Sequence, residues 1–337
     1  MNGSSRARFA ALAAAIIVGS VAPLGCADMF QREPGPATAS TAGPRTAPDD
    51  SDLWNLAPAS ADLVAEVDLA ALRASPWSKS LMASDVSGQR EEGRRLYGYD
   101  VFSEADRLLE VVSEAGGTPH SLTIVRGTFD PARVGAAFTA AAPGATADRW
   151  RESPIWEGGG QAVALVTPRT LAEGDPGSVR AAIDAAWGVV PDARTVPLGA
   201  VRRSLDADHG GPAAFIAFNV TDSMRARASG VGVDLPPGLA LGAARVDLGD
   251  DLNVEVTGTL DTPPNALAAA AAGTVAARAY AQNTMVRLLG LAPVLAGVTF
   301  GAEGTHVHGH LRIPAERREG LADKLLAVLQ MVAAARH

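Results

Sequence analysis

One order of predicted elements occurs twice in the sequence from residue 52 onward: strand, helix, strand, strand, helix. In the first half a strand over about 63–69 runs into a helix, and in the second a strand over about 213–220 runs into a helix capped by Thr221 or Asp222. Residue identity between the halves is too low to establish a sequence repeat. Consecutive strands mixed with helices predict an α+β fold of two similar-sized halves, with mainly antiparallel sheets packed against helices. Two packed sheets and one long sheet both fit this order.

Two Asp-Pro pairs mark helix starts in the first half. Asp130 precedes Pro131, and Asp175 precedes Pro176. A capping side chain followed by proline at the first helical position is typical of a helix N-terminus. A strand is expected before each helix. The segment 161–174 is expected to be a single buried strand that ends in a turn at its final glycine.

The second half continues with two alternating strands around a turn at 249–251, a helix over 265–282, a hairpin within 297–314 and a closing helix over 315–336. The first of these helices is rich in Ala, so it could pack closely on the sheet or on a partner. The closing helix has an apolar stripe typical of a core-facing side, made by Leu321, Leu325, Val328, Leu329 and Val332.

The boundary between the halves is expected between Pro191 and Gly211, where the chain is polar and rich in helix and strand breakers. The first half then covers 51–195 and the second 211–337. Hydrophobic residues make up 47% of the chain and charged residues 20%, which is the balance of a folded globular body. The net charge of −8, without a cluster of Lys or Arg, argues against nucleic acid as a partner.

The first 25 residues predict a secretory signal peptide. Arg6 and Arg8 precede an apolar run of 16 residues, Phe9 to Leu24, which Gly25 and Cys26 follow at once. A membrane-spanning helix needs about 20 apolar residues. An uncleaved anchor is therefore the weaker interpretation.

Cys26 is the single cysteine of the chain and cannot form an internal disulfide. The residues "PLGC" that end with it resemble the lipobox of bacterial lipoproteins, in which the cysteine after a small residue is acylated and becomes the mature N-terminus. Pro23 and Leu24 depart from that pattern, since the family usually has an aliphatic and a small residue there. An incidental cysteine beside a signal peptide is the alternative.

The resemblance implies an exported protein held on the membrane by a lipid anchor at Cys26, because two or three acyl chains give stable attachment. Ala27, instead of Asp, follows the cysteine, which favours the outer membrane, facing the periplasm, under the sorting rule of some Gram-negative bacteria. The segment 26–50 is rich in Pro, Ala, Thr, Ser and Gly and predicts a disordered linker with a mean reach of about 25–30 Å.

Three histidines alternate in the predicted hairpin: His306, His308 and His310. Residues two apart in a strand share a face, with neighbouring Cβ atoms about 6.6 Å apart. Two such imidazoles can chelate one ion, but three from one straight strand rarely converge. Glu303 or Glu255 would then have to supply a further ligand.

Two interpretations of these histidines stay open. In one, Val307 and Leu311 point inward and the imidazoles face water. In the other, the strand binds a transition metal, either weakly or as a dedicated site. No other cofactor is indicated.

The remaining candidates have ordinary structural explanations. Glu66 and Asp68 alternate in a strand and could pair for acid–base chemistry, but solvation at a strand edge also explains them. The glycines at 158–160 lack the spacing of a phosphate-binding loop. All the tryptophans lie in the first half, where they indicate core packing or a ligand or partner groove: Trp54, Trp77, Trp150, Trp156 and Trp187.

Three classes of function fit the sequence. The leader, the linker and the lack of a recognisable catalytic motif favour a non-catalytic lipoprotein that binds or scaffolds in the cell envelope, where another envelope protein is a possible partner. The alternatives are a metal-binding envelope protein that uses the three histidines and an enzyme with an unrecognised site. No catalytic residue is identified, and enzymatic activity stays open as the less favoured choice.

Overall fold

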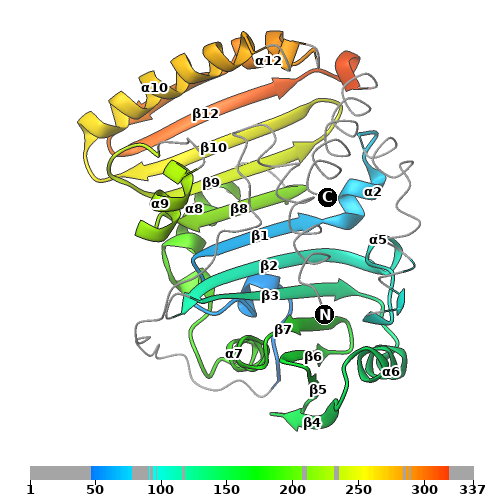
Figure 1. The fold of residues 1–337 in the computed structure, drawn as a ribbon. Coiled ribbons are helices and arrows are strands. Elements are labelled where there is room, and N and C mark those ends of the chain that lie inside the picture. Colours follow the sequence, from blue (N-terminus) through cyan, green and yellow to red (C-terminus); the bar gives the residue numbers. More distant parts are fainter. Residues whose placement is uncertain are drawn as a thin grey trace.

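The structure is a computed structural model that describes residues 47–77, 91, 94–95, 97–115, 118–206, 211–230, 235–283, 286–287 and 290–318. The described strands form one twelve-stranded sheet in which every neighbouring pair is antiparallel (Figure 1). From one edge to the other the strands are β11 (Thr299–Glu303), β12 (His306–Ile313), β10 (Leu252–Leu260), β9 (Leu239–Leu248), β8 (Ala214–Asn219), β1 (Leu63–Asp68), β2 (Ala105–Ala115), β3 (Thr118–Gly127), β7 (Thr170–Gly174), β6 (Gln161–Thr167), β5 (Ser153–Gly158) and β4 (Thr146–Trp150). The predicted α+β class with mainly antiparallel strands is confirmed, and the strands form one long sheet.

The two halves meet where β1 pairs with β8. This antiparallel pair sets Leu63 opposite Phe218 and Val67 opposite Ala214, so the sheet is continuous across the predicted boundary. On each side of the junction a strand leads into a helix and, further along the chain, into a hairpin and another helix. The first half has β1, α2 (Leu69–Ala74), the short α5 (Val101–Glu104), β2, β3 and α6 (Pro131–Ala141), and the second has β8, α9 (Asp222–Gly230), β9, β10 and α10 (Pro263–Ala281). The hairpins β6–β7 and β11–β12 follow, and each packs beside the hairpin of its own half.

Polar caps start the helices at the predicted places. Asp130 accepts a hydrogen bond from the backbone N–H of Ala132 at the start of α6 (Pro131–Ala141), and Asp175 accepts one from Ser178 at the start of α7 (Pro176–Ala186). The Thr262 side chain caps α10 (Pro263–Ala281). Each such cap is worth about 1 kcal/mol, and proline at the first position loses no intrahelical bond.

Helices cover the two faces of the sheet over different strands. On one face, α7 and α8 (Pro197–Asp206) pack with the 3-10 turns Leu53–Asn55 and Ala193–Thr195 over the middle and the first half, in a core that includes Trp54, Val64 and Phe215. On the other face, α6 covers one end, and α10 with α12 (Ala292–Ala296) covers the other. The shorter elements are α2 (Leu69–Ala74), α5 (Val101–Glu104), α9 (Asp222–Gly230) and a 3-10 turn at Ala315–Arg317.

Some predicted elements differ from those observed. The segment 161–174 is a hairpin, β6 and β7, with its turn at Pro168 and Arg169, and so the prediction of a single strand was wrong. Both strands are buried on both faces, and the signal for the turn was present, because Pro168 and Arg169 interrupt the apolar run and are exposed. Strands β2, β4 and β5 were not predicted. Beyond Arg318, the predicted closing helix lies outside the described residues.

The folded body begins earlier than the predicted end of the linker. The backbone N–H of Asp49 donates to the carbonyl of Ala186, 3.1 Å away. One carboxylate oxygen of Asp50 accepts from the hydroxyls of Thr167 and Thr170, at 2.6 and 2.7 Å. Asp49 and Asp50 therefore lie on the body beside α7 and the β6–β7 turn, whereas the prediction placed them in the linker.

Candidate functional site

The three histidines lie on the solvent-exposed face of β12, near one edge of the sheet. His306, His308 and His310 are exposed, while Leu311 between the outward positions is buried and Val307 is half-buried. The strand thus has the alternation that the sequence predicts for a half-buried strand.

The neighbouring strands add few ligand groups to this face. Glu303 lies opposite His306 on β11, and Glu255 lies opposite His310 on β10. His308 lies between Thr257 and Gly301, neither of which is a strong metal ligand. Within the part of the chain that the structure describes, no group of three or more His, Cys, Asp or Glu is arranged to hold a metal ion.

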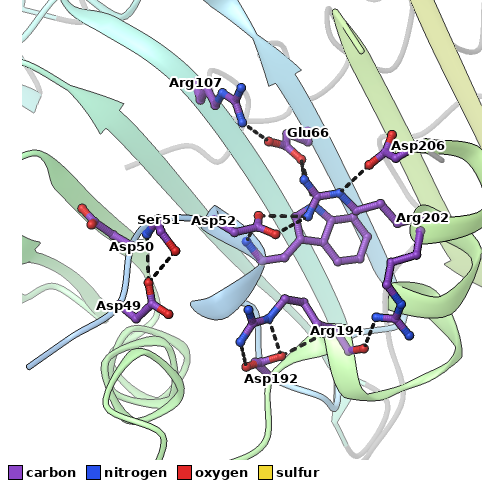
Figure 2. A network of polar contacts seen from close by, with 12 residues as sticks. Asp49, Asp50, Ser51, Asp52, Glu66, Arg107, Asp192, Arg194, Arg202 and Asp206 are labelled. Atoms are coloured by element: carbon purple, nitrogen blue, oxygen red, sulfur yellow. Dashed lines mark hydrogen bonds and ion pairs between the residues drawn. The ribbon is translucent and has the colours of Figure 1, made fainter. Parts of the chain in front are cut away.

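Glu66 is buried in the middle of the sheet, so the interpretation as a solvated strand edge was wrong. Strand β1 has β2 on one side and β8 on the other, and Glu66 is 6% exposed. One carboxylate oxygen accepts from the indole N–H of Trp54 at 2.9 Å and lies 3.1 Å from Arg202; the other lies 3.4 Å from Arg107 (Figure 2). Asp68 caps α2 with one carboxylate oxygen, which accepts from the N–H of Ala71 at 2.7 Å, and its other oxygen lies 3.3 Å from Arg107. Asp68 and Glu66 therefore share the Arg107 guanidinium.

Arg202 connects three parts of the chain at this cluster. Its guanidinium lies 2.7 Å from the carboxylate of Asp52 in the N-terminal segment and 3.5 Å from Asp206 on its own helix, in addition to Glu66 on β1. The same group stacks 4.8 Å from the ring centroid of Trp54. We call Asp52, Trp54, Glu66, Arg107, Arg202 and Asp206 the central network.

Burial raises the pKa of Glu66, and the positive charge of Arg202 opposes that rise. The nearby Asp52 carboxylate adds to the rise, and Arg107 and the Trp54 hydrogen bond oppose it. A buried carboxylate with a raised pKa is typical of an acid–base site, but here both oxygens are engaged by side chains of the protein. The central network is therefore better explained as a support that joins the N-terminal segment, the sheet and α8.

Arg245 extends these polar contacts along the same face. Its side chain is 1% exposed and donates two hydrogen bonds to the carboxylate of Asp247, at 2.8 and 2.9 Å, as a bidentate ion pair. It also donates to the backbone carbonyl of Leu205 at 2.7 Å and lies 3.2 Å from Asp206. Asp206 thereby bridges Arg202 and Arg245. The sequence offered no signal for this pairing, because β9 and α8 are distant along the chain.

The tryptophans serve mainly in packing. Trp54 and Trp77 are buried, and Trp150, Trp156 and Trp187 are half-buried. Trp156 lies against Gly135 of α6, where a Cβ atom would come within 2.7 Å of the ring. The two border an open depression of about 550 Å³, which is otherwise lined by Pro131, Ala132, Ala136, Thr139 and Ala140. The Thr139 hydroxyl already donates to the Gly135 carbonyl, so no converging polar groups mark a reaction site there.

The outward side of α10 is apolar and exposed. The helix turns Ala266, Ala270 and Ala281 toward the sheet, and its large apolar side chains Leu267 and Val275 are 64% and 65% exposed. We define the α10 surface as the exposed apolar residues of this helix: Leu267, Ala268, Ala271, Ala272, Val275, Ala276, Ala279 and Tyr280. Contiguous exposed apolar surface on a folded domain is typical of an interaction site.

Close approach of backbone and ring holds α10 on the sheet. A Cβ atom at Gly273 would lie 3.0 Å from the ring of Phe300 on β11, so the helix can approach this strand closely. Phe300 points away from the histidine face, because it packs with the core that contains Val294 and Leu311. The α10 surface and the histidines therefore belong to opposite sides of the same end of the sheet.

Comparison with known proteins yields no family. No family model matches the chain, and no curated protein resembles it in sequence. Solved structures that resemble it include three crystal forms of TP0453. Crystal form I has 9% identity and a TM-score of 0.46, covering 85% of this chain and 99% of that one. Crystal form III has 9% identity and a TM-score of 0.47, covering 80% of this chain and 98% of that one. Crystal form IV has 10% identity and a TM-score of 0.44, covering 84% of this chain and 97% of that one.

Proposed function

We propose that the chain is an exported lipoprotein, held on a membrane of the cell envelope by acyl chains on Cys26, with a non-catalytic binding or scaffolding role. The observation that carries the proposal is the apolar run that ends at Gly25 and Cys26, after Arg6 and Arg8. Acylation would also explain why the single cysteine of the chain stands at this position.

The way the body begins supports a tether at this end. Asp49 and Asp50 are bonded to α7 and the β6–β7 turn, and Asp52 is bonded to Arg202 of the central network. A chain attached to a membrane at Cys26 would therefore lead into a firmly bonded part of the fold. Among the helices that the structure describes, none has both the length and the apolar character needed to cross a bilayer.

The state of the polar side chains supports a non-catalytic role. The buried carboxylate of Glu66 is engaged by Trp54, Arg202 and Arg107. The three histidines project from the exposed face of a strand, and the depression of about 310 Å³ that His310 borders has no carboxylate or second histidine among the described residues that line it. Catalysis requires titratable groups that converge on a space where a substrate can be held. Neither place has that arrangement. The exposed apolar α10 surface instead favours binding.

Mass spectrometry of the native mature protein tests the anchor. We expect an N-terminal Cys26 that carries acyl chains, and a Cys26→Ala variant that leaves the detergent-soluble membrane fraction as a precursor or a soluble form. A free thiol at Cys26 in the mature protein would contradict the proposal.

We further propose the outer membrane, facing the periplasm, as the location in a Gram-negative host, because Ala27 instead of Asp follows the cysteine. Ala27→Asp is expected to retain the acylated protein at the inner membrane in a host that applies this sorting rule. Separation of the two membranes on a density gradient measures the shift. Equal distribution of the two forms would contradict the location without touching acylation.

A further inference from the structure

We propose that the α10 surface is a second contact with the membrane, in which the helix lies against the lipid bilayer that the acyl chains of Cys26 anchor. This inference rests on the proposed function, since the anchor keeps the body beside one bilayer. The occupant of the surface is a lipid layer with anionic headgroups.

Side chains of α10 show what such a contact would bury. Leu267, Val275 and Tyr280 are 64%, 65% and 42% exposed, and Ala residues fill the positions between them in two adjacent i, i+4 rows. Tyr280 and Arg278, both exposed, stand in the last turn of the helix and point in different directions around it. An amphipathic tyrosine and a long basic side chain at the end of an apolar stretch suit the boundary between acyl chains and headgroups.

The charge of this edge fits an anionic lipid surface. The chain has 37 acidic residues and a net charge of −8, yet none of the acids falls within residues 262–302, which include α10, α12 and most of β11. Arg278 and Arg287 are the charged residues of this stretch. Arg317 lies close to its end, with a guanidinium nitrogen 3.5 Å from the carbonyl of Gly290. An acidic protein can bring this edge to an anionic membrane with the least repulsion.

The position of the tether permits this contact. The described chain begins at Ala47, and Asp49 and Asp50 are bonded near β7, whereas α10 lies at the other end of the sheet (Figure 1). Strands β7 and β12 are separated by seven strand spacings in the sheet order, or about 34 Å at 4.8 Å each. The chain between Cys26 and Ala47 can extend to about 70 Å. The anchor and the α10 surface can therefore reach the same bilayer.

The size of the surface argues against a second copy as its occupant. A helix of 19 residues is about 28 Å long and about 10 Å wide, so a helix-to-helix contact would cover about 300 Å² on each partner. Stable protein complexes bury about 800 Å² on each side. A small apolar contact is sufficient when a tether holds it near its target, because the contact then forms within one assembly.

A dye at one engineered cysteine tests the proposal, because acylation blocks the native thiol of Cys26. The acylated full chain with Val275→Cys carries an environment-sensitive dye and is reconstituted into phosphatidylethanolamine–phosphatidylglycerol vesicles. We expect a blue-shifted emission that loses most of its intensity when the acyl chains are brominated. His306→Cys is the matched control, since it is exposed at the same end of the sheet but on the opposite face, and its dye is expected to remain unquenched.

A second variant removes the apolar contact and leaves the fold intact. Leu267→Gln with Tyr280→Gln changes exposed side chains only, so circular dichroism should be unchanged while the quenching at position 275 falls several-fold. Phosphatidylcholine vesicles should also reduce the quenching, because they lack the anionic headgroup. An acylated chain whose dye at position 275 is unquenched on every vesicle would overturn the inference and leave the anchor standing.

Failure of the anchor gives a different result. If Cys26 is unmodified, the proposed function is wrong, and the dye measurement is repeated in a Cys26→Ser chain with a large excess of vesicles. Quenching there would sustain the α10 contact alone, and its absence would reject it. A blue shift that depends on protein concentration and ignores brominated lipid would identify a second copy as the occupant and overturn the proposal.

Discussion

The guanidinium of Arg202 stacks over the indole of Trp54, at 4.8 Å, while both side chains contact the same buried oxygen of Glu66. Trp54 comes from the N-terminal segment, Arg202 from α8 and Glu66 from the centre of the sheet. This arrangement makes the first residues of the body part of its core. A force applied to these first residues through a membrane anchor would therefore be transmitted to the sheet.

Replacing Arg202 is expected to destabilise the fold strongly. Arg202→Met keeps most of the apolar stem but leaves the buried Glu66 without its nearest positive charge, and removing one partner of a buried pair costs about 3–5 kcal/mol. Chemical denaturation measures the free energy of unfolding. Arg203→Met, on the exposed side of the same helix, is the control and should change it by less than about 0.5 kcal/mol. A similar loss in the free energy of unfolding in both variants would refute a special role for the contact between Arg202 and Glu66.

The stability contributed by Glu66 should depend on pH. Burial raises its folded-state pKa above the unfolded value, so the folded protein binds this proton more tightly. The contribution is fully present below the unfolded pKa and is lost as the pH rises through the folded pKa. Unfolding of the unmodified chain and of Glu66→Gln, measured from acid to neutral pH, should therefore show the difference shifting in favour of the unmodified chain as the pH falls. A difference independent of pH would contradict this.

Asp175 should show the opposite dependence. Burial alone would raise its pKa, but hydrogen bonds from the Ser178 hydroxyl and N–H, at 2.6 and 3.0 Å, and from His120 lower it overall. The stability that Asp175 contributes is present above the pKa of this carboxyl in the unfolded chain, and it is lost as the pH falls through the pKa in the folded protein. Asp175→Ala should cost about 1 kcal/mol at neutral pH through loss of the helix cap, and less in acid. Thermal unfolding at both pH values measures this; an equal cost at both would oppose it.

Two changes in the N-terminal segment should have very different effects on the stability of the fold. Deleting residues 27–46, a segment rich in Pro, Ala, Thr, Ser and Gly, should leave the melting temperature nearly unchanged. Asp50→Ala should instead cost about 1–3 kcal/mol, because the hydroxyls of Thr167 and Thr170 lose their acceptor. A large loss on deletion would show that the body begins before residue 47.

The exposed histidines should behave as an ordinary strand face. Replacing His306 and His308 together with Gln should change the free energy of unfolding by less than about 0.5 kcal/mol. Micromolar zinc should add little to the melting temperature of the unmodified chain, whereas a site occupied at 100 times its dissociation constant would add about 2.7 kcal/mol. A zinc-dependent stabilisation of the unmodified chain that disappears in the double variant would establish a metal site.

Local features of the sequence were sufficient for many elements of the fold. Asp130 with Pro131, and Asp175 with Pro176, start α6 and α7 as predicted, and the strands around residues 249–251 form the expected hairpin. Alternation alone was sufficient to assign the histidines to one side of β12. Caps, turns and strand periodicity depend on residues a few positions apart, so they can be recognised without knowledge of the fold.

Tertiary structure decided how these elements combine and what their polar residues do. Leu63 pairs with Phe218 across the junction of the halves, and this pairing makes β1 a central strand and buries Glu66. The partners of that carboxylate come from residues 54, 107 and 202, and no local pattern brings them together. The exposed side of α10 was also undecided, since an Ala-rich helix with Arg278 as its single charged residue gives little direction to its packing. Pairing and burial depend on contacts between residues far apart in the chain, and the sequence determines those contacts only through the whole fold.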